Sequence, residues 1–357
     1  MKHRLTPPLC LVVLAVVVSA LTSCKAPQAY GDRNSVIVRA DSLLWAEMGA
    51  EITATIERRV FTTRPERVFQ VTSIAPGDSL WNDFRLWQQL VILGTSADEL
   101  VRDLVSDSDD PDATAPAILQ LTGKWARGQL ITVVLLPTAD QADALRALLP
   151  QLYDGLDAAY QRWIIERMYT TGVDDSLRQA LAGFGFTIDL PRVYEYAWQD
   201  SLFRFSNSYL QGDSDLLRSL VVTWKSGGGG ATLDSLRAWR ATIDESLYEP
   251  GQDIIEDGIS VDSVRIDGLT GIEFRGVWQD RDQFPAAGPF IARAIACPAA
   301  DRTYYMDAWL YAPGKDKYPY VRQLEILLDS FRCATEDDSR VSSATRAGPK
   351  TEASSTS

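Results

Sequence analysis

The order of apolar and polar residues divides the chain into two regions with different hydrophobic patterns. In residues 35–172, short apolar runs that predict buried strands alternate with segments of helical periodicity. The expected strands are 35–39, 68–73, 89–94 and 130–136, and the expected helices are 41–60, 97–105 and 139–169, the last broken at Pro150. This alternation is typical of a layered α/β lobe with a largely buried sheet.

Residues 173–333 carry short segments with two-residue alternation and tight connections, which favour antiparallel pairing. The expected strands are 186–190, 192–198, 203–207, 216–224, 271–278, 289–297 and 303–311, and the expected helices are 232–248 and 318–331. The predicted fold class is α+β: a layered α/β N-terminal lobe (35–172) followed by a mainly antiparallel sheet with flanking helices (173–333).

The first residues have the pattern of an export signal. A cationic head at residues 2–4 precedes the apolar run Leu9–Leu21, which is shorter than the roughly 20 residues that a membrane span needs. The next residues complete Leu21-Thr22-Ser23-Cys24, which resembles the lipobox of bacterial lipoproteins. We therefore predict a signal peptide at 1–23, lipidation of Cys24 and a polar tether at 24–34. Ordinary signal cleavage or an uncleaved anchor is the alternative.

The expected partner of Cys24 is a lipid bilayer, because two or three acyl chains give stable anchoring where one is marginal. Lys25 stands where an aspartate would favour retention in the inner membrane. We therefore expect a cell-envelope protein, lipid-anchored at the outer membrane. The Ser-, Thr- and charge-rich residues 334–357 are expected to form a disordered tail.

Charge and histidine content exclude several classes of function. The chain has 35 Lys and Arg against 48 Asp and Glu, a net charge of −13, so nucleic acid is not an expected partner. Its one histidine, His3, lies in the signal peptide. The mature protein therefore lacks the imidazole of Ser-His-Asp and Cys-His mechanisms and of the usual zinc site. Pro313–Lys317 lacks the spacing of a phosphate-binding loop, and no metal or cofactor is expected.

Cys297 and Cys333 are the two cysteines that remain after export and lipidation. An oxidising compartment favours a disulfide between them. The alternative is a pair of buried, reduced cysteines.

The C-terminal strands and the turn after them combine aromatic and basic side chains. We predict a binding surface here for an envelope protein or a glycan, because sugars stack on aromatic rings and cations steer acidic ligands. Its candidate residues are Trp278, Asp307, Trp309, Tyr311, Lys315, Lys317 and Arg322. The alternative is that the aromatics are core residues and the cations are solvated.

A competing class of function is a carboxylate-dependent hydrolase of envelope polysaccharide. Glu273 and Asp307 are expected on neighbouring strands, and two carboxylates are the minimum for glycoside hydrolysis. Arg275 pairing with Asp307 across the sheet is the structural alternative. An enzyme would show two carboxylates converging in a pocket, whereas a binding module would show an open aromatic or apolar patch.

The same C-terminal region resembles a known family. The residues that carry the resemblance are Arg275-Gly276-x-Trp278, Phe284, Gly288-Pro289-Phe290, Asp307, Tyr311–Lys315, Arg322, Leu324 and Glu325, with earlier landmarks at Asp41–Trp45, Gly49, Ile188–Pro191 and Tyr194. They are similar to an uncharacterised lipoprotein family of Bacteroidetes-type bacteria, domain of unknown function 4837. The resemblance implies an envelope location and no particular activity. The leading hypothesis for the function is a non-enzymatic envelope lipoprotein that binds an envelope protein or a glycan through the C-terminal sheet face.

Overall fold

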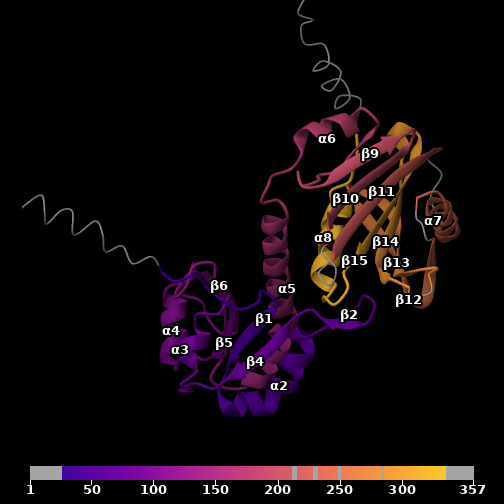
Figure 1. Ribbon diagram of the computed structural model, residues 1–357. Coiled ribbons are helices and arrows are strands. Elements are labelled where there is room, and N and C mark those ends of the chain that lie inside the picture. The colour runs from indigo at the N-terminus through magenta and orange to yellow at the C-terminus, as the bar shows by residue number, and fades with distance from the viewer. Residues whose placement is uncertain (1–25, 211–214, 228–231, 248–250, 283–284, 335–357) are drawn as a thin grey trace, which may run out of the picture. The chain divides into compact units, whose positions relative to one another are not determined.

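The computed structural model describes residues 26–210, 215–227, 232–247, 251–282 and 285–334 (Figure 1). The predicted signal peptide, Cys24 and the tail from 335 onward lie outside the described residues. Residues up to Glu57 together with Phe69–Asp154 form unit 1, and Arg58–Val68 together with residues from Gly155 onward form unit 2. Among the described residues, no helix combines the length and the apolarity needed to cross a membrane.

Unit 1 is built on a five-stranded sheet with the order β4-β1-β5-β7-β6. Four strands are parallel and β6 runs antiparallel at one edge. The strands are β1 (Ser35–Arg39), β4 (Gln70–Ile74), β5 (Gln89–Gly94), β6 (Ala117–Thr122) and β7 (Leu130–Leu135). The helices are α2 (Ser42–Ile56), α3 (Trp81–Phe84), α4 (Glu99–Ser106) and α5 (Gln141–Met168), which continues into unit 2.

The central strands β1, β5 and β7 are buried on both faces because helices cover both sides of the sheet. Ile37 and Ile92 belong to a core with Val101 and Leu104 of α4 on one face. Val36 and Val38 alternate with Ile37 and are also fully buried. Figure 1 shows α3 and α4 on one side of the sheet and α2 with the first part of α5 on the other. Within the expected tether, Ala29 donates a backbone hydrogen bond to Arg127, which precedes β7.

Unit 2 is built on a seven-stranded antiparallel sheet with the order β12-β13-β14-β15-β11-β10-β9. The strands are β9 (Glu195–Gln199), β10 (Leu202–Tyr209), β11 (Leu216–Ser226), β12 (Gln252–Ile266), β13 (Leu269–Asp280), β14 (Ala287–Cys297) and β15 (Arg302–Tyr311). The helices are α6 (Asp175–Ala182), α7 (Leu233–Leu247) and α8 (Tyr318–Asp329), with a 3-10 turn at Pro298–Ala300. Two small two-stranded sheets pair β2 (Arg59–Phe61) with β3 (Pro65–Arg67) and β8 (Phe186–Thr187) with β16 (Arg332–Cys333).

Each face of this large sheet has its own core. On the α7 face, Leu236, Trp239 and Ile243 of α7 pack against Phe274 and Phe290. On the α8 face, α6 and α8 pack against the alternate residues of the same strands, including Met306 and Ile291. A disulfide joins Cys297 at the end of β14 to Cys333 after α8.

The observed elements confirm the predicted α+β class, with a layered α/β part and a mainly antiparallel sheet flanked by helices. The expected break at Pro150 is wrong, because α5 runs through this residue. A proline inside a helix costs about 3 kcal/mol through its missing N–H and its clash with the preceding turn. Here the buried side chains of Leu145, Leu149 and Leu152 hold both parts of the helix by packing.

Candidate ligand-binding site

The aromatic residues predicted to form a binding surface lie on the α7 face of the unit 2 sheet. Trp278 and Trp309 are buried and meet edge to face, with ring centroids 5.2 Å apart. The indole N–H of Trp278 donates to the carbonyl of Leu310 at 3.2 Å. Tyr311 is half-buried beside them. Most of this aromatic surface is therefore core beneath α7. This agrees with the alternative interpretation, in which the aromatic residues belong to the core.

Trp309 also borders a shallow, open pocket of about 350 Å³ on the part of the α7 face formed by β9, β10 and β11. Arg204, Ser206 and Ser219 line this pocket with it. Trp309 is therefore a predicted binding residue that lines a pocket on this face.

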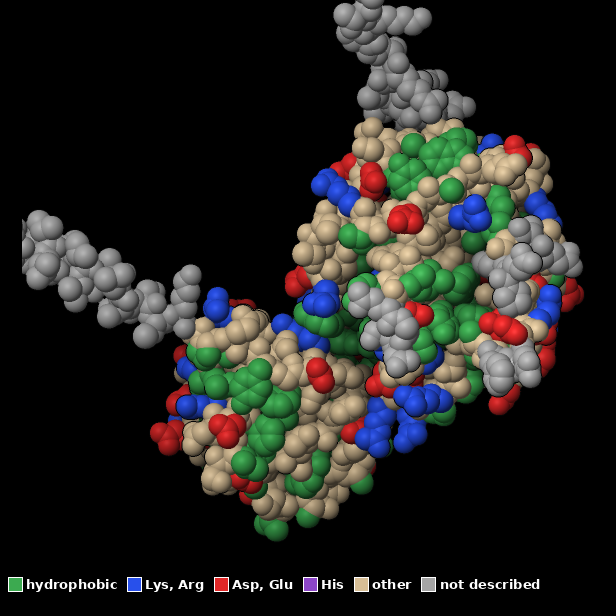
Figure 2. All heavy atoms as spheres, viewed as in Figure 1, with side chains coloured by type: hydrophobic (Ala, Val, Ile, Leu, Met, Phe, Trp, Pro, Cys, Tyr) green, Lys and Arg blue, Asp and Glu red, His purple; other side chains and the backbone are tan. Residues whose placement is uncertain are grey.

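The basic residues predicted for the same surface lie at the start of α8, which packs on the opposite face. Arg322 donates to Asp157 and Glu325, at 3.2 Å each. The backbone N–H of Lys317 donates to Glu66 at 2.7 Å, and Lys315 and Lys317 flank Asp316. On the face shown in Figure 2, basic and acidic side chains lie side by side on unit 2. The seven predicted residues therefore do not form one surface.

Glu273 and Asp307 do not converge. The prediction that they lie on neighbouring strands is wrong, because β14 pairs with both β13 and β15 and separates them. Glu273 is bonded on the α8 face to Arg293 at 2.6 Å, whereas Asp307 faces α7. Arg275 pairs with Glu273 and Glu325 instead of Asp307. The predicted pair of catalytic carboxylates is therefore not formed.

Glu273 is the centre of a buried charge network. Burial opposes its ionisation, but hydrogen bonds and charges from Arg275 and Arg293 outweigh burial and lower the pKa of the Glu273 carboxyl below its ordinary 4.5. The stabilisation that the carboxylate provides is therefore fully present above pH 4.5 and is lost as the pH falls through the lower pKa of the folded protein.

We predict that Glu273→Gln lowers the free energy of unfolding at pH 7 by roughly 1–3 kcal/mol, because Arg293 loses its buried anionic partner. The difference from the wild type should shrink as the pH falls below 4.5. Urea unfolding of the wild type and the variant at a series of pH values measures this difference in the free energy of unfolding. A difference that stays constant down to pH 3 would show that the Glu273 carboxylate does not provide the stabilisation.

Asp307 is fully buried and pairs with Arg240 of α7, whose Nε lies 3.4 Å from its Oδ1. Arg240 also donates to Gln252 at 3.1 Å and lies 4.1 Å from the ring centroid of Phe290. Burial raises the pKa of Asp307, although Arg240 opposes the rise. The contacts of Asp307 hold α7 on the sheet. They also leave the Asp307 carboxyl out of reach of a ligand.

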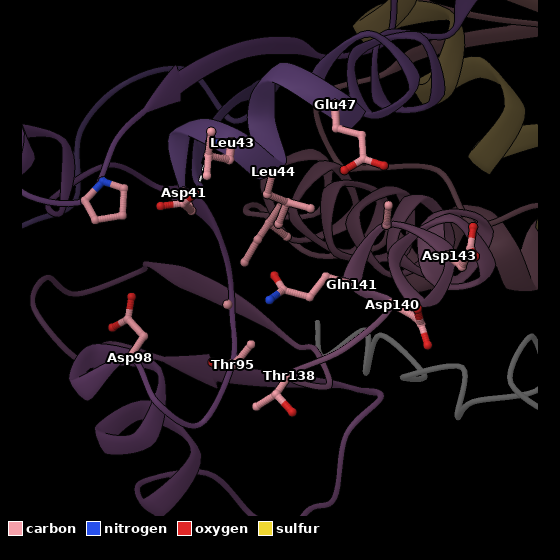
Figure 3. Close-up of a pocket in the computed structure, with 14 residues that line it drawn as sticks. Asp41, Leu43, Leu44, Glu47, Thr95, Asp98, Thr138, Asp140, Gln141 and Asp143 are labelled. Carbon is pink, nitrogen blue, oxygen red and sulfur yellow. Dashed lines mark hydrogen bonds between the residues drawn. The ribbon is translucent and has the colours of Figure 1, made fainter.

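A pocket of unit 1 lies at the carboxyl ends of its parallel strands (Figure 3). It has a volume of about 680 Å³, and we call it the acidic pocket. Its walls are the residues that follow β1, β4, β5 and β7 and the first turns of α2 and α5. It is lined by Asp41, Leu43, Leu44, Glu47, Pro76, Leu93, Gly94, Thr95, Asp98, Thr138, Asp140, Gln141, Ala142 and Asp143.

The topology explains why a pocket forms there. From β1 the chain crosses to β4 on one side, whereas from β5 it continues to β6 and β7 on the other. The connections after β1 and β5 therefore leave the sheet in opposite directions and open a crevice between them. In open α/β sheets, ligands bind in this crevice at the switch point, outside the carboxyl ends of the strands.

Two of the acidic residues also begin helices. The Asp41 carboxylate accepts a hydrogen bond from the backbone of Leu43 at 2.8 Å, which caps α2. The Asp98 carboxylate caps α4 by accepting from Leu100 at 2.9 Å, and it also pairs with Arg39 at 2.9 Å. These interactions fix the two carboxylates at the edge of the pocket.

The remaining carboxylates are more available. Asp143 pairs with Arg146, but no hydrogen bond or ion pair within the described ranges occupies the side chain of Glu47 or Asp140. Figure 3 shows Gln141 and Leu44 near the middle of the pocket, with Asp41 and Asp98 on one side and Glu47, Asp140 and Asp143 on the other. None of the described lining residues is basic. The carboxylates are spread around the rim, and in the described part of the chain no three His, Cys, Asp or Glu side chains group closely enough for a metal.

Sequence reasoning proposed none of these lining residues for a binding site. A signal was present, because the apolar strands at 35–39, 89–94 and 130–136 are followed by Asp41, Thr95 and Thr138. The carboxyl ends of parallel strands meet at one edge of a sheet, so these side chains were candidates for a common site. The order of the strands, which sets the switch point, is not visible in the sequence.

Comparison with known families concerns unit 2. Residues 176–330 match the family described as Domain of unknown function (DUF4837). This match confirms the predicted resemblance over the strands β9–β15 and helix α8, whereas Asp41–Trp45 and Gly49 lie outside the matched residues. The DUF4837 segment therefore contains the whole seven-stranded sheet, and the acidic pocket lies outside it.

No curated protein has a sequence significantly similar to this chain. Among solved structures, the cyanobacterial PsbP (CyanoP) from Synechocystis sp. PCC 6803 is 12% identical, covers 42% of this chain and 86% of its own, and has a TM-score of 0.29. The Ran-binding protein Mog1p of Saccharomyces cerevisiae is 11% identical, covers 44% of this chain and 94% of its own, and has a TM-score of 0.31. At these TM-scores neither likeness bears on the fold or function of this chain.

Proposed function

We propose that the protein is a lipid-anchored envelope protein that binds a hydroxyl- or ammonium-bearing ligand, such as a sugar unit of an envelope glycan, in the acidic pocket. The observation that supports this most is the position of the pocket at the switch point of the unit 1 sheet. Its volume of about 680 Å³ is within the range of small-molecule sites. The lipobox at Cys24 supports the envelope location.

The lining decides the class of ligand. Five carboxylates, two threonine hydroxyls and the Gln141 amide present mostly hydrogen-bond acceptors to the pocket. A ligand that supplies hydroxyl or ammonium donors matches them, whereas an anionic ligand is repelled by the like charge. Leu43 and Leu44 add apolar surface against the carbon skeleton of a sugar.

We predict that glucosamine, protonated at pH 6, binds about tenfold more tightly than glucose, because its ammonium group meets carboxylates. Glu47→Gln and Asp140→Asn should each weaken glucosamine more than glucose. Asparagine tolerates the left-handed backbone of Asp140, which has a φ of 55°, so the fold is retained. Titration calorimetry at low and high salt measures the affinities for glucosamine and glucose. High salt should reduce the difference between the two affinities, because it screens the charges.

Asp112→Asn is the matched control, since it removes an exposed carboxylate of unit 1 outside the pocket. Its affinities should equal those of the wild type. Equal affinity for the two sugars in the wild type, or equal losses in all three variants, would contradict the assignment of the ligand to this pocket.

A second candidate is the carboxylate-dependent hydrolase, and the specific observation in its favour is that Glu47 and Asp140 line one pocket from different elements. Hydrolysis needs one carboxyl as acid and another as base or nucleophile. If the wild-type protein releases reducing ends from a glucosamine oligomer, and both Glu47→Gln and Asp140→Asn abolish this release, the result would favour the enzyme. Binding without release favours the binding protein.

We predict that Cys24→Ser transfers the protein from the membrane fraction to the soluble fraction of the envelope, because it removes all acyl chains. Cys10→Ser, which changes a cysteine of the predicted signal peptide, is the control and should leave the protein in the membrane fraction. Sedimentation of the Cys24→Ser protein with membranes to the wild-type extent would refute lipid anchoring.

A further inference from the structure

A second cavity of unit 2 differs from the rest of this acidic chain in its charge. It has a volume of about 180 Å³ and lies between the end of α5, the loop before β9, strands β10 and β11, and α8. Arg167 and Arg218 line it, and none of its described lining residues is acidic. In a chain with 48 acidic and 35 basic residues, a cavity lined by two arginines and no carboxylate is an exception to the general surface charge. We call it the arginine cavity.

Arg218 is held in the cavity by its neighbours. It lies opposite Asn207 in the register of β10 and β11, so the two side chains share the α8 face. One guanidinium nitrogen, Nη1, donates to the amide oxygen of Gln323 at 2.6 Å. The Nε atom is buried, and no acceptor within the described residues reaches it. A buried guanidinium N–H without an acceptor costs free energy, and an anionic ligand would remove that cost.

The other walls supply further donors. Tyr194 is buried, and burial raises the pKa of its phenol to about 12, so its hydroxyl stays protonated and can donate at neutral pH. Asn207 contributes an amide. Arg167 is exposed at the last turn of α5, with its guanidinium 5.9 Å from the ring centroid of Trp163. Its planar guanidinium is suited to binding a carboxylate or phosphate through two hydrogen bonds.

We propose that the arginine cavity is a binding site for an oxyanion, the phosphate or carboxylate group of a small ligand, held by Arg218 and Arg167 with Asn207 and Tyr194 as neutral donors. The volume far exceeds the roughly 10–15 Å³ that one water molecule needs, so the cavity holds such a group and part of the molecule that carries it. The site is in unit 2 and does not depend on the ligand of the acidic pocket.

The test measures the melting temperature of the purified full-length protein in sodium phosphate and in sodium acetate, against sodium chloride at equal ionic strength. A ligand that binds the folded state raises the melting temperature in a concentration-dependent and saturable way. We expect saturation with a Kd on the order of 1 mM or below for at least one anion. A response to phosphate alone identifies a phosphoryl ligand, and a response to acetate alone identifies a carboxylate.

Arg218→Gln and Arg167→Gln should each weaken that anion about tenfold or more, because each removes a charge-assisted hydrogen bond. Arg167 is exposed, so its variant keeps the test valid if Arg218→Gln unfolds. Arg204→Gln, on β10 but lining the α7-face pocket, is the matched control and should bind as the wild type. A response to neither anion beyond that to chloride overturns the proposal, and so does wild-type affinity in the Arg167→Gln protein.

Discussion

Replacement of Cys297 and Cys333 by alanine together should lower the free energy of unfolding by about 3–4 kcal/mol. The disulfide closes a loop across 36 positions, from the end of β14 to the residues after α8. Without it, the unfolded chain gains conformations that the cross-link forbids, and this entropy favours unfolding. The bond also holds the short β8–β16 pair beside the α8-face core, so part of the loss will come from the folded state.

Urea unfolding under non-reducing conditions gives the difference, and reduction of the wild-type protein should produce a loss of similar size. Reductant added to the double-alanine protein is the control and should change nothing. Labelling of two thiols in the denatured, unreduced wild-type protein would show that the protein lacks the bond. A loss below about 1 kcal/mol would contradict the cross-link mechanism.

Arg240→Met should destabilise the protein by about 3–5 kcal/mol at pH 7, because it leaves Asp307 buried without its cationic partner. Asp307 is fully buried, its Oδ2 has no hydrogen-bond partner within the described residues, and the carboxylate of Asp244 raises its pKa further. Removal of Arg240 should raise the pKa of Asp307 still more. A carboxyl group whose folded pKa lies above its unfolded value loses stabilisation as the pH rises, so the loss should be smaller at pH 4 than at pH 7.

Arg237→Met is the matched control, because Arg237 precedes Arg240 by three residues on the same helix but pairs with the exposed Glu256. The Arg237→Met variant should lose no more than about 1 kcal/mol of the free energy of unfolding. The double variant Arg240→Met/Asp307→Asn should be less destabilised than Arg240→Met alone, since no buried charge remains unpaired. Equal losses for Arg237→Met and Arg240→Met would show that the buried pair does not anchor α7.

Much of the fold could be predicted because burial imposes periodicity. The apolar residues of α2 at Leu44, Met48, Ile52 and Ile56 are spaced by four, and all four are buried. The strands at 35–39 and 89–94 have the predicted bounds, since strands covered on both faces are continuously apolar.

Two of the elements that sequence reasoning missed, β12 and the β2–β3 hairpin, lack that periodicity. β12 (Gln252–Ile266) is an edge strand that is exposed or half-exposed along most of its length, and its register shifts between Ile255 and Ser260. Alternation of apolar and polar residues does not mark a strand whose two faces both meet water. The β2–β3 hairpin has only three residues on each side, too few for any pattern.

The candidate site was beyond prediction for a related reason. Trp278 and Trp309 are aromatic strand residues, a pattern that describes a binding platform and a buried core equally well. The structure places them under α7 because Trp239 and Ile243 of that helix cover the same face. The acidic pocket, in turn, is assembled from turns that lie far apart in the chain, among them those at Asp41, Thr95 and Thr138, and only the strand order brings them together.

The most direct test of the proposed function is to locate glucosamine on the protein by NMR of methyl-labelled leucines in the Cys24→Ser form. Leu43, Leu44 and Leu93 line the acidic pocket. Their methyl resonances should shift with glucosamine concentration, while those of Leu236 of α7 and Leu324 of α8 in unit 2 should not. The absence of shifts at the three pocket leucines, or shifts confined to unit 2, would contradict the account.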